Sequence, residues 1–312
     1  MRIRPSTSLS VPAWITLLAV AFALVLVGCG SNSGSSKSAR KSKKPTSGSA
    51  ERASKERPRP GDQKVTLTWK GKQRGYTVHA PPGYTTGKQL PLVIAMHPYP
   101  SYGDYVAQLS GFSRKADEKG FLVAYPDGLD GGYNALACCG TEDDVGFIRT
   151  MTKRLIDTWK ADPDRIYATG ISNGGDMSYK LAVETDVLAA IAPVSGGYIG
   201  SATQSPDYVP RTPVSVMTFI GGQDQNYGAF DNGVKQWQQR LGCTAGPEKK
   251  VRGDSTRTTA KCRDTSEFVA YRLPSMGHSW PGSGDSRMGD MLTGIQATDL
   301  IWDFFASHPK RS

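Results

Sequence analysis

The feature that most constrains this chain is the stretch Gly170-Ile171-Ser172-Asn173-Gly174, which has the form G-x-S-x-G. The β-branched and aromatic run Arg165–Thr169 before it predicts a buried strand, and residues 176–183 after it predict a helix. A serine on such a sharp strand-to-helix turn stands exposed above a sheet, because the flanking glycines let the backbone turn without a Cβ clash. The pattern occurs once in the chain, and it predicts Ser172 as a nucleophile.

Residues 63–312 alternate short apolar runs with longer amphipathic segments, and they are long enough for one large core. This alternation is typical of an α/β domain with a mainly parallel sheet covered by helices on both faces. Lys64–Lys70 and Gly75–Ala80 are expected to pair antiparallel. The other expected strands are Leu92–Met96, Phe121–Tyr125, Arg165–Thr169, Ala189–Val194, Val214–Ile220 and Phe268–Leu273. The expected helices are Tyr105–Lys119, Val145–Ala161, Gly174–Thr185, Gly228–Leu241 and Ala297–Ala306.

A serine hydroxyl becomes a good nucleophile when a base accepts its proton and a third group orients that base. The chain has four histidines, so the base can be sought by elimination. His79 lies in the N-terminal strand pair, His308 lies near the end of the chain, and His97 ends an expected strand. His278 lies in a glycine- and proline-flanked loop after the last strand, and we predict that it is the base.

The acid should lie between the serine and the histidine in the chain. Asp224 is the best candidate, because it lies in the loop directly after the expected strand that ends at Ile220. Asp231 is the alternative, although it falls within the following helix, and Asp207 precedes the strand. The order of serine, acid and histidine then matches that of α/β-hydrolases and differs from the orders in the chymotrypsin and subtilisin folds.

An oxygen that becomes negative during attack on a carbonyl needs hydrogen-bond donors. The backbone N–H of Asn173, at a helix N-terminus, is the first expected donor. The second should come from the loop His97-Pro98-Tyr99-Pro100, in which Tyr99 is the expected donor because proline has no N–H. No spacing of Cys, His, Asp and Glu suggests a metal site, and no cofactor is expected.

Residues 1–28 have the pattern of a secretory signal, with Arg2 and Arg4 before an apolar run from Val11 to Val27. The ending Leu26-Val27-Gly28-Cys29 resembles a bacterial lipobox, which implies cleavage before Cys29 and lipidation of its thiol. The alternative is an uncleaved anchor, since about 17 residues is at the short limit for a spanning helix. Both alternatives predict an extracytoplasmic protein tethered to a bacterial membrane.

Residues 29–62 are expected to form a disordered linker of Ser, Gly, Pro and basic residues, because apolar residues are nearly absent. The linker holds nine Lys and Arg against three acidic residues, so it accounts for most of the formal charge of +10. Residues 63–312 carry only +2, and the basic composition is therefore no evidence for nucleic-acid binding. The linker is expected to act as a solvated spacer; contact with anionic lipid headgroups is the alternative.

Several motifs occur around the candidate residues. They are Tyr125–Gly128, Tyr133-Asn134, Cys138–Gly140, Asp143–Phe147, Asp162–Tyr167, Gly170–Gly175, Ala192–Gly196, Gly277–Gly282 and Ile301–Phe305. Together they resemble the esterase family of poly(3-hydroxybutyrate) depolymerases and feruloyl esterases, over nearly all of residues 63–308. The resemblance implies an α/β-hydrolase fold and hydrolysis of carboxylic esters.

Two positions depart from the usual pattern of that family. His97-Pro98 stands where the family usually has His-Gly, and Tyr133-Asn134 stands where it often has Trp-Asn. The first departure concerns the oxyanion loop, and the second lies near the expected substrate cleft. His97, Tyr133, Asn134 and Trp280 are the candidates for residues that line this cleft.

Four cysteines remain when Cys29 is set aside, an even number that suits an oxidising compartment. Three connectivities are possible, and the family resemblance favours a bond between Cys243 and Cys262 around a polar excursion. Cys138 and Cys139 are adjacent, so they either pair with each other or pair elsewhere; both are expected near the cleft.

The sequence therefore predicts an extracytoplasmic serine carboxylesterase that acts on a small or oligomeric ester of the hydroxyalkanoate, feruloyl or acetyl type. A serine peptidase of the prolyl-oligopeptidase type uses the same chemistry, but such enzymes usually carry a further propeller or cap domain. A non-catalytic surface-binding lipoprotein is the third alternative. The sequence does not distinguish among the acyl groups.

Overall fold

The computed structural model describes residues 57–310. The predictions for the signal segment, for lipidated Cys29 and for most of the linker lie outside these residues. The first strand begins at Gly61, slightly before the domain boundary expected at residue 63. No helix within residues 57–310 is long and apolar enough to span a membrane.

The centre of the structure is an eleven-stranded sheet in the order β1-β2-β4-β3-β5-β6-β7-β11-β10-β8, with β9 also paired to β10. Neighbouring strands from β4 to β11 along this order are parallel, while β1, β2, β8, β9 and β10 pair antiparallel. The strands are β1 (Gly61–Trp69), β2 (Lys72–Ala80), β3 (Leu90–Met96), β4 (Leu122–Pro126), β5 (Ala161–Ile171), β6 (Ala190–Val194), β7 (Ser215–Gly221), β8 (Thr244–Ala245), β9 (Lys249–Arg252), β10 (Ser255–Lys261) and β11 (Glu267–Leu273). This mostly parallel sheet is consistent with the α/β-hydrolase fold.

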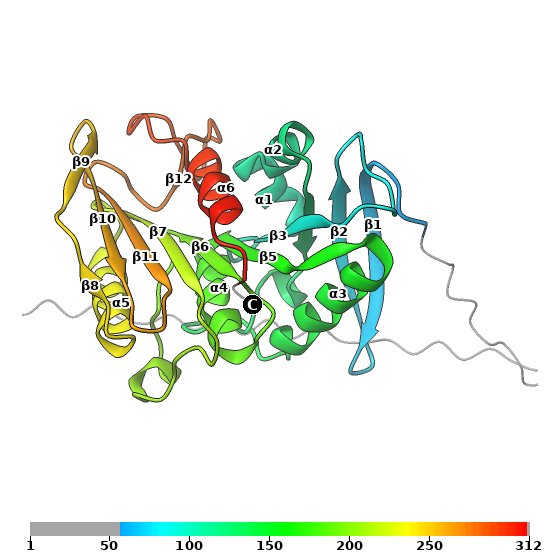
Figure 1. The fold of residues 1–312 in the computed structure, drawn as a ribbon, viewed down its shortest axis with the longest axis horizontal. Helices are drawn as coiled ribbons and strands as arrows, with labels where there is room; N and C mark the ends of the chain where they lie inside the picture. The colour runs from blue at the N-terminus through cyan, green and yellow to red at the C-terminus, as the bar shows by residue number, and fades with distance from the viewer. Residues whose placement is uncertain (1–56, 311–312) are drawn as a thin grey trace, which may run out of the picture. The chain divides into compact units, whose positions relative to one another are not determined.

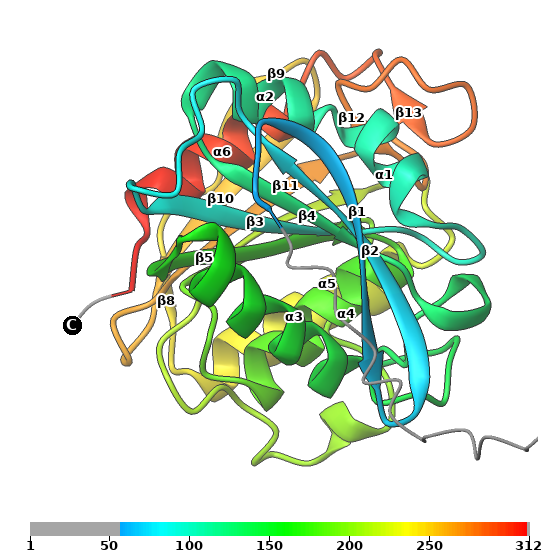
Figure 2. The ribbon, with the colours of Figure 1, turned by 90° about the vertical axis from the view of Figure 1, so that its right-hand side faces the viewer.

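Two layers of helices cover the sheet, as Figure 2 shows. On one face, α3 (Asp144–Trp159), α4 (Asn173–Glu184) and α5 (Tyr227–Arg240) pack against one hydrophobic core. On the other face, α1 (Gly103–Ser110), α2 (Phe112–Lys119) and α6 (Ala297–Ser307) pack against a second core (Figure 1). The alternation within β3 explains the two cores: Leu92 and Ile94 face the first, and Val93 faces the second.

All eight strands expected from the sequence are present, as are the expected helices, with one difference. The segment Tyr105–Lys119 was expected to form one helix, but it forms α1 and α2. Gly111 separates them with φ +66°, a left-handed conformation that ends α1. The apolar period continues on both sides of Gly111, which explains why the sequence pattern indicates one helix.

The segment after α5 is a sheet extension that the sequence pattern does not indicate. β8, β9 and β10 continue the central sheet beyond β11, and their residues are mostly polar. Cys243 and Cys262 form the expected disulfide across this segment. Two short parallel strands, β12 (Trp280–Pro281) and β13 (Gly289–Asp290), form a separate ladder in the loop after β11.

Candidate active site

Ser172 lies on a tight turn between the end of β5 at Ile171 and the start of α4 at Asn173. Its backbone has φ 57° and ψ −122°, a strained conformation for a residue with a side chain. The turn lies close to the end of β3, since a Cβ on Gly174 would stand 2.2 Å from the carbonyl oxygen of Met96. A Cβ on Gly170 would stand 2.6 Å from the same oxygen. Only glycine fits at both positions, which accounts for the G-x-S-x-G pattern.

Asp224 and His278 form a direct side-chain pair. His278 Nδ1 lies 2.6 Å from Asp224 Oδ2, although 54 positions separate the two residues. The Asp224 side chain is fully buried, and its Oδ1 also accepts a hydrogen bond from the N–H of Asn226 at 2.9 Å. The His278 side chain is 30% exposed. This contact joins the Nδ1 side of the ring to Asp224 and leaves Nε2 on the opposite side of the ring.

Asp231, the alternative acid, has other partners. Its Oδ1 accepts hydrogen bonds from Arg272 Nε and Nη2, at 3.0 and 2.7 Å. Its Oδ2 lies 2.7 Å from Lys235 Nζ, one turn further along α5. The structure thus places Asp231 in an ion-pair cluster between α5 and β11, and it places Asp224 beside His278.

The three candidate residues follow strands of the same parallel sheet. Ser172 follows β5, Asp224 follows β7, and His278 follows β11. Because the carboxyl ends of parallel strands meet at one edge of a sheet, the three loops gather at that edge. The backbone connects two of them further, since Gly222 N donates to Leu273 O at 2.8 Å and Gln223 N donates to Met276 O at 2.8 Å.

The side chain of Asn173 holds the loop that contains Tyr133 and Cys138. Its Oδ1 accepts a hydrogen bond from Tyr133 N at 2.8 Å, and its Nδ2 donates to Tyr133 O at 3.1 Å and to Cys138 O at 3.0 Å. Asn173 is buried at the start of α4. The local sequence pattern predicts a role only for the backbone N–H of Asn173, because the partners of its side chain lie 35 to 40 positions away.

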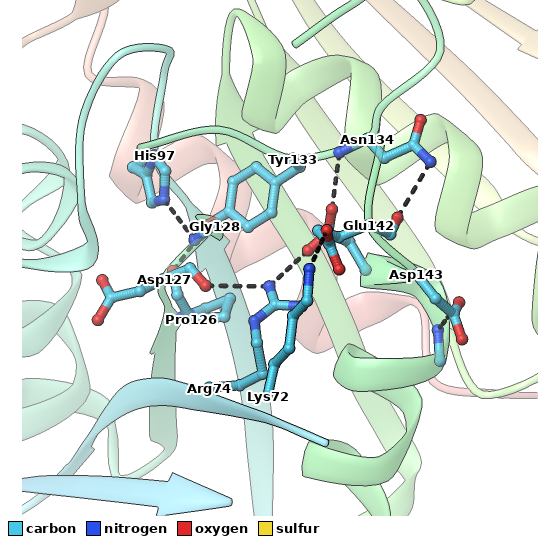
Figure 3. A network of polar contacts seen from close by, with 12 residues as sticks. Lys72, Arg74, His97, Pro126, Asp127, Gly128, Tyr133, Asn134, Glu142 and Asp143 are labelled. Carbon is cyan, nitrogen blue, oxygen red and sulfur yellow. Dashed lines mark hydrogen bonds and ion pairs between the residues drawn. The ribbon is translucent and has the colours of Figure 1, made fainter. Parts of the chain in front are cut away.

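A buried ion pair between Arg74 and Asp144 supports the same loop; Figure 3 labels Arg74 and the loop residues Tyr133 and Asn134. Arg74 Nη2 on β2 lies 2.5 Å from Asp144 Oδ1 at the start of α3, and both side chains are 1% exposed. The second oxygen of Asp144 accepts a hydrogen bond from the N–H of Asn134 at 2.7 Å. The pair therefore fixes the backbone directly after Tyr133. The Cys138–Cys139 disulfide lies further along this loop, on the exposed side.

Three of the four residues expected to line a cleft are instead buried supports. His97 is fully buried; its Nδ1 donates to Pro98 O at 2.8 Å, and its Nε2 accepts from Gly128 N at 2.9 Å. Burial lowers the pKa of His97 to about 4, so the ring is neutral at physiological pH. Tyr133 is also fully buried, and its hydroxyl donates to Pro126 O at 2.6 Å.

Trp280 is the third of the cleft candidates that the fold buries. Its indole N–H donates a hydrogen bond to Thr298 Oγ1 at 3.0 Å. Its ring packs edge-on against Phe112 of α2. Asn134 is partly buried, and its Nδ2 donates to Glu142 O at 3.0 Å. Asn134, Cys138 and Lys180 do line a shallow polar pocket of about 290 Å³, beside the loop that Asn173 holds. Tyr99, by contrast, is 50% exposed.

Asp176 is a buried carboxyl close to the candidate site that the sequence analysis did not single out. It lies in the first turn of α4, and its Oδ1 accepts a hydrogen bond from the N–H of Gly197 at 2.8 Å. Burial raises the pKa of Asp176 to about 7, while the hydrogen bond from the Gly197 N–H and, to a smaller extent, the nearby His278 partly offset this effect. The signal that could have found Asp176 in the sequence is its charge, at a position on the helix face that packs against β6.

Residues 74–211 match the esterase PHB depolymerase family. The matched region contains Ser172, the loop that Asn173 holds and the buried ion pair. Feruloyl esterase B of Piromyces equi is 29% identical over 238 residues, which are 69% of this chain and 44% of the relative. Feruloyl esterase C of Emericella nidulans is 28% identical over 246 residues, which are 74% of this chain and 83% of the relative.

Among solved structures, an acetyl xylan esterase from Aspergillus awamori aligns with a TM-score of 0.54 and 17% identity. The alignment covers 78% of this chain and 99% of that one. This structural similarity supports the same fold for the two proteins. The chain spans less than half the length of the first two curated relatives it matches. The family match covers residues 74–211, and the chain is similar to proteins named as feruloyl esterases.

Proposed function

We propose that this protein is an extracytoplasmic serine carboxylesterase with Ser172 as nucleophile, His278 as base and Asp224 as the acid that orients the base. The observation that carries the proposal is the 2.6 Å contact between His278 Nδ1 and a fully buried Asp224 carboxylate, at the sheet edge where the Ser172 turn also lies. Similarity to named esterases favours carboxylic esters over amides as the substrates.

In this mechanism, His278 Nε2 accepts the hydroxyl proton while Ser172 Oγ forms a bond to the ester carbonyl carbon. The tetrahedral intermediate then collapses, the carbon–oxygen bond to the alcohol breaks, and the imidazolium returns its proton to the departing alcohol. Water, deprotonated by the same ring, attacks the acyl-enzyme and releases the acid and Ser172. Asp224 stabilises the imidazolium in both halves of the cycle and stays ionised.

The oxyanion is expected to bind two backbone donors. Asn173 is the first residue of α4, so its N–H has no carbonyl in a preceding helical turn to bind. The Tyr99 N–H is the proposed second donor, in the loop after β3, whose end at Met96 lies against Gly174. The hydrogen bonds of the Asn173 side chain fix the first donor, because they hold the residue in place without using its N–H.

The proposed substrates are esters of hydroxyalkanoate oligomers, of feruloyl groups or of acetylated sugars. The named relatives act on feruloyl and acetylxylan esters, and the matched family is that of PHB depolymerases. The protein is proposed to work outside the cytoplasm, tethered through lipidated Cys29 and the linker 29–62, with residues 63–312 as catalytic domain. Two disulfides suit that compartment.

The test is hydrolysis of p-nitrophenyl butyrate beside a dipeptide amide, by the purified chain and its variants. Ser172→Ala and His278→Ala should each lower kcat on the order of 10⁴-fold or more, and the double variant should lose little further, because the two residues act as one unit. Asp224→Asn should lower kcat far more than Asp231→Asn, its matched control. A near-native esterase rate for Ser172→Ala would exclude the mechanism, and cleavage of the amide alone would indicate a peptidase.

A further inference from the structure

Ser195 is a strained residue in the loop that follows β6. Its φ is +42°, in the left-handed region that favours glycine, and its side chain is fully buried. Such a backbone is unfavourable for a residue with a side chain, and it persists only where the surrounding structure holds it. β6 lies between β5 and β7 in the sheet, so its loop lies between the Ser172 turn and the Asp224 loop.

The hydroxyl of Ser195 holds the residue next to His278. Ser195 Oγ donates a hydrogen bond to Ser279 O at 3.1 Å and accepts one from Ser279 N at 3.2 Å. One hydroxyl thus satisfies both backbone groups of Ser279, across 84 positions of sequence. This contact fixes the backbone of the His278 loop, whereas the bond to Asp224 fixes the direction of the ring.

The backbone around Ser195 contacts the two other loops of the site. Ser172 N donates to Val194 O at 3.1 Å, and Ser195 N donates to Phe219 O on β7 at 2.9 Å. A Cβ on Gly196 would stand 2.9 Å from Ser172 O, so the nucleophile turn also packs directly against this segment. Residues 194–196 are therefore in contact with the serine turn, with the strand that leads to the acid and with the histidine loop.

We propose that Ser195 is a positioning residue: its hydroxyl sets the distance between the His278 ring and Ser172 by holding Ser279. The proposal rests on the function proposed above. An error of about 1 Å in the placement of a catalytic group can cost on the order of 10²-fold in rate. The reacting distance between Ser172 and His278 depends on two loops that come from different strands. Ser195 connects both to one rigid segment.

The experiment compares Ser195→Ala and Ser195→Gly in the full chain, with Ser215→Ala as matched control. Both Ser195 variants lose the hydroxyl, but only glycine also relieves the strained φ, so Ser195→Gly is expected to fold. Ser215 Oγ likewise accepts a backbone hydrogen bond in a buried place, from Glu267 N at 3.1 Å, at the start of β7 and away from the site. Ser215→Ala should lower Tm and leave kcat unchanged.

Both Ser195 variants should lower kcat toward p-nitrophenyl butyrate by about 10- to 100-fold, with KM within about twofold of the wild type. They should also slow labelling of Ser172 by a fluorophosphonate to the same degree. Wild-type kcat in both Ser195 variants, with or without a lower Tm, would overturn the proposal. A loss in Ser195→Ala that Ser195→Gly does not share would also overturn it, because strain and packing would then be the cause.

A readout without turnover separates this proposal from the proposed function. The proton between His278 Nδ1 and Asp224 should give a downfield NMR resonance, which its loss in His278→Ala would assign. It should shift or broaden in Ser195→Ala and stay unchanged in Ser215→Ala. If the wild type hydrolysed no ester while this resonance responded to Ser195, the esterase function would be wrong and the positioning of His278 would stand. An unchanged resonance in both Ser195 variants would overturn the positioning role.

Discussion

At the residue scale, Tyr99 contributes through its backbone in the proposed mechanism. It lies between Pro98 and Pro100, neither of which has an N–H, and half of its side chain is exposed. Tyr99→Ala keeps the backbone donor, so most of the activity should remain. Tyr99→Pro removes the donor and should lower kcat on the order of 10²-fold. Steady-state kinetics on variants that circular dichroism shows to be folded would check this. Equal, modest losses of kcat in the two variants would mean that a group other than the Tyr99 N–H is the second oxyanion donor.

The buried carboxyl of Asp176 predicts that the stability of the protein depends on pH. Its pKa is raised by burial to about 7 in the folded protein, from a value near 4 when unfolded. Between these two values the native state keeps a proton that the unfolded chain has released. The free energy of unfolding therefore falls as pH rises through this window and is level above it.

Asp176→Asn removes this ionisation while it keeps an oxygen for the N–H of Gly197. From pH 5 to pH 8, the free energy of unfolding of the variant should fall less than that of the wild type. The two falls should differ by on the order of a few kcal/mol. Urea unfolding at several pH values measures the difference. If the two stability curves ran parallel across this range, the protonated form of Asp176 would have no part in the native state.

At the element scale, the Arg74–Asp144 pair joins β2 to the start of α3 and holds Asn134. Arg74→Met would leave a buried carboxylate without its partner, which typically costs about 3–5 kcal/mol. Lys72→Met is the matched control, because Lys72 bonds Glu142 in the same region but is 55% exposed, and it should cost about 0–1 kcal/mol.

The midpoint of urea unfolding checks both variants. Because the loop that the pair supports also holds Asn173, Arg74→Met should lower kcat even where it is fully folded. Equal destabilisation by the two variants would mean that burial of the Arg74 pair contributes nothing.

At the scale of the whole molecule, the tether decides where the proposed esterase acts. Cys29→Ser should abolish lipidation, because the thiol that accepts the lipid is lost. Metabolic labelling with a palmitate analogue should then disappear, and the precursor should accumulate or leak into the medium. Cell fractionation with an antibody to the chain measures the second effect. Persistent labelling of this variant would exclude lipidation at Cys29.

Local sequence patterns predict the strands and helices that surround the candidate site. The apolar runs of β3, β5 and β7 and the glycines around Ser172 are local features of the sequence, so the pattern predicts them. The break at Gly111 and the polar strands β8 to β10 were missed. A left-handed glycine and an edge pairing depend on the partners that the fold supplies, and these leave no periodic signal.

Local sequence patterns identify a serine on a glycine turn, an acid after a strand and a histidine in the last long loop. The folded chain places Asp224 beside His278, and it buries His97, Tyr133 and Trp280. The hydrogen bonds between Ser195 and Ser279 and the ion pair between Arg74 and Asp144 also form only in the folded chain. The physical reason is that burial and hydrogen-bond pairing belong to segments far apart in the chain, which meet only when the sheet and its two helix layers are assembled.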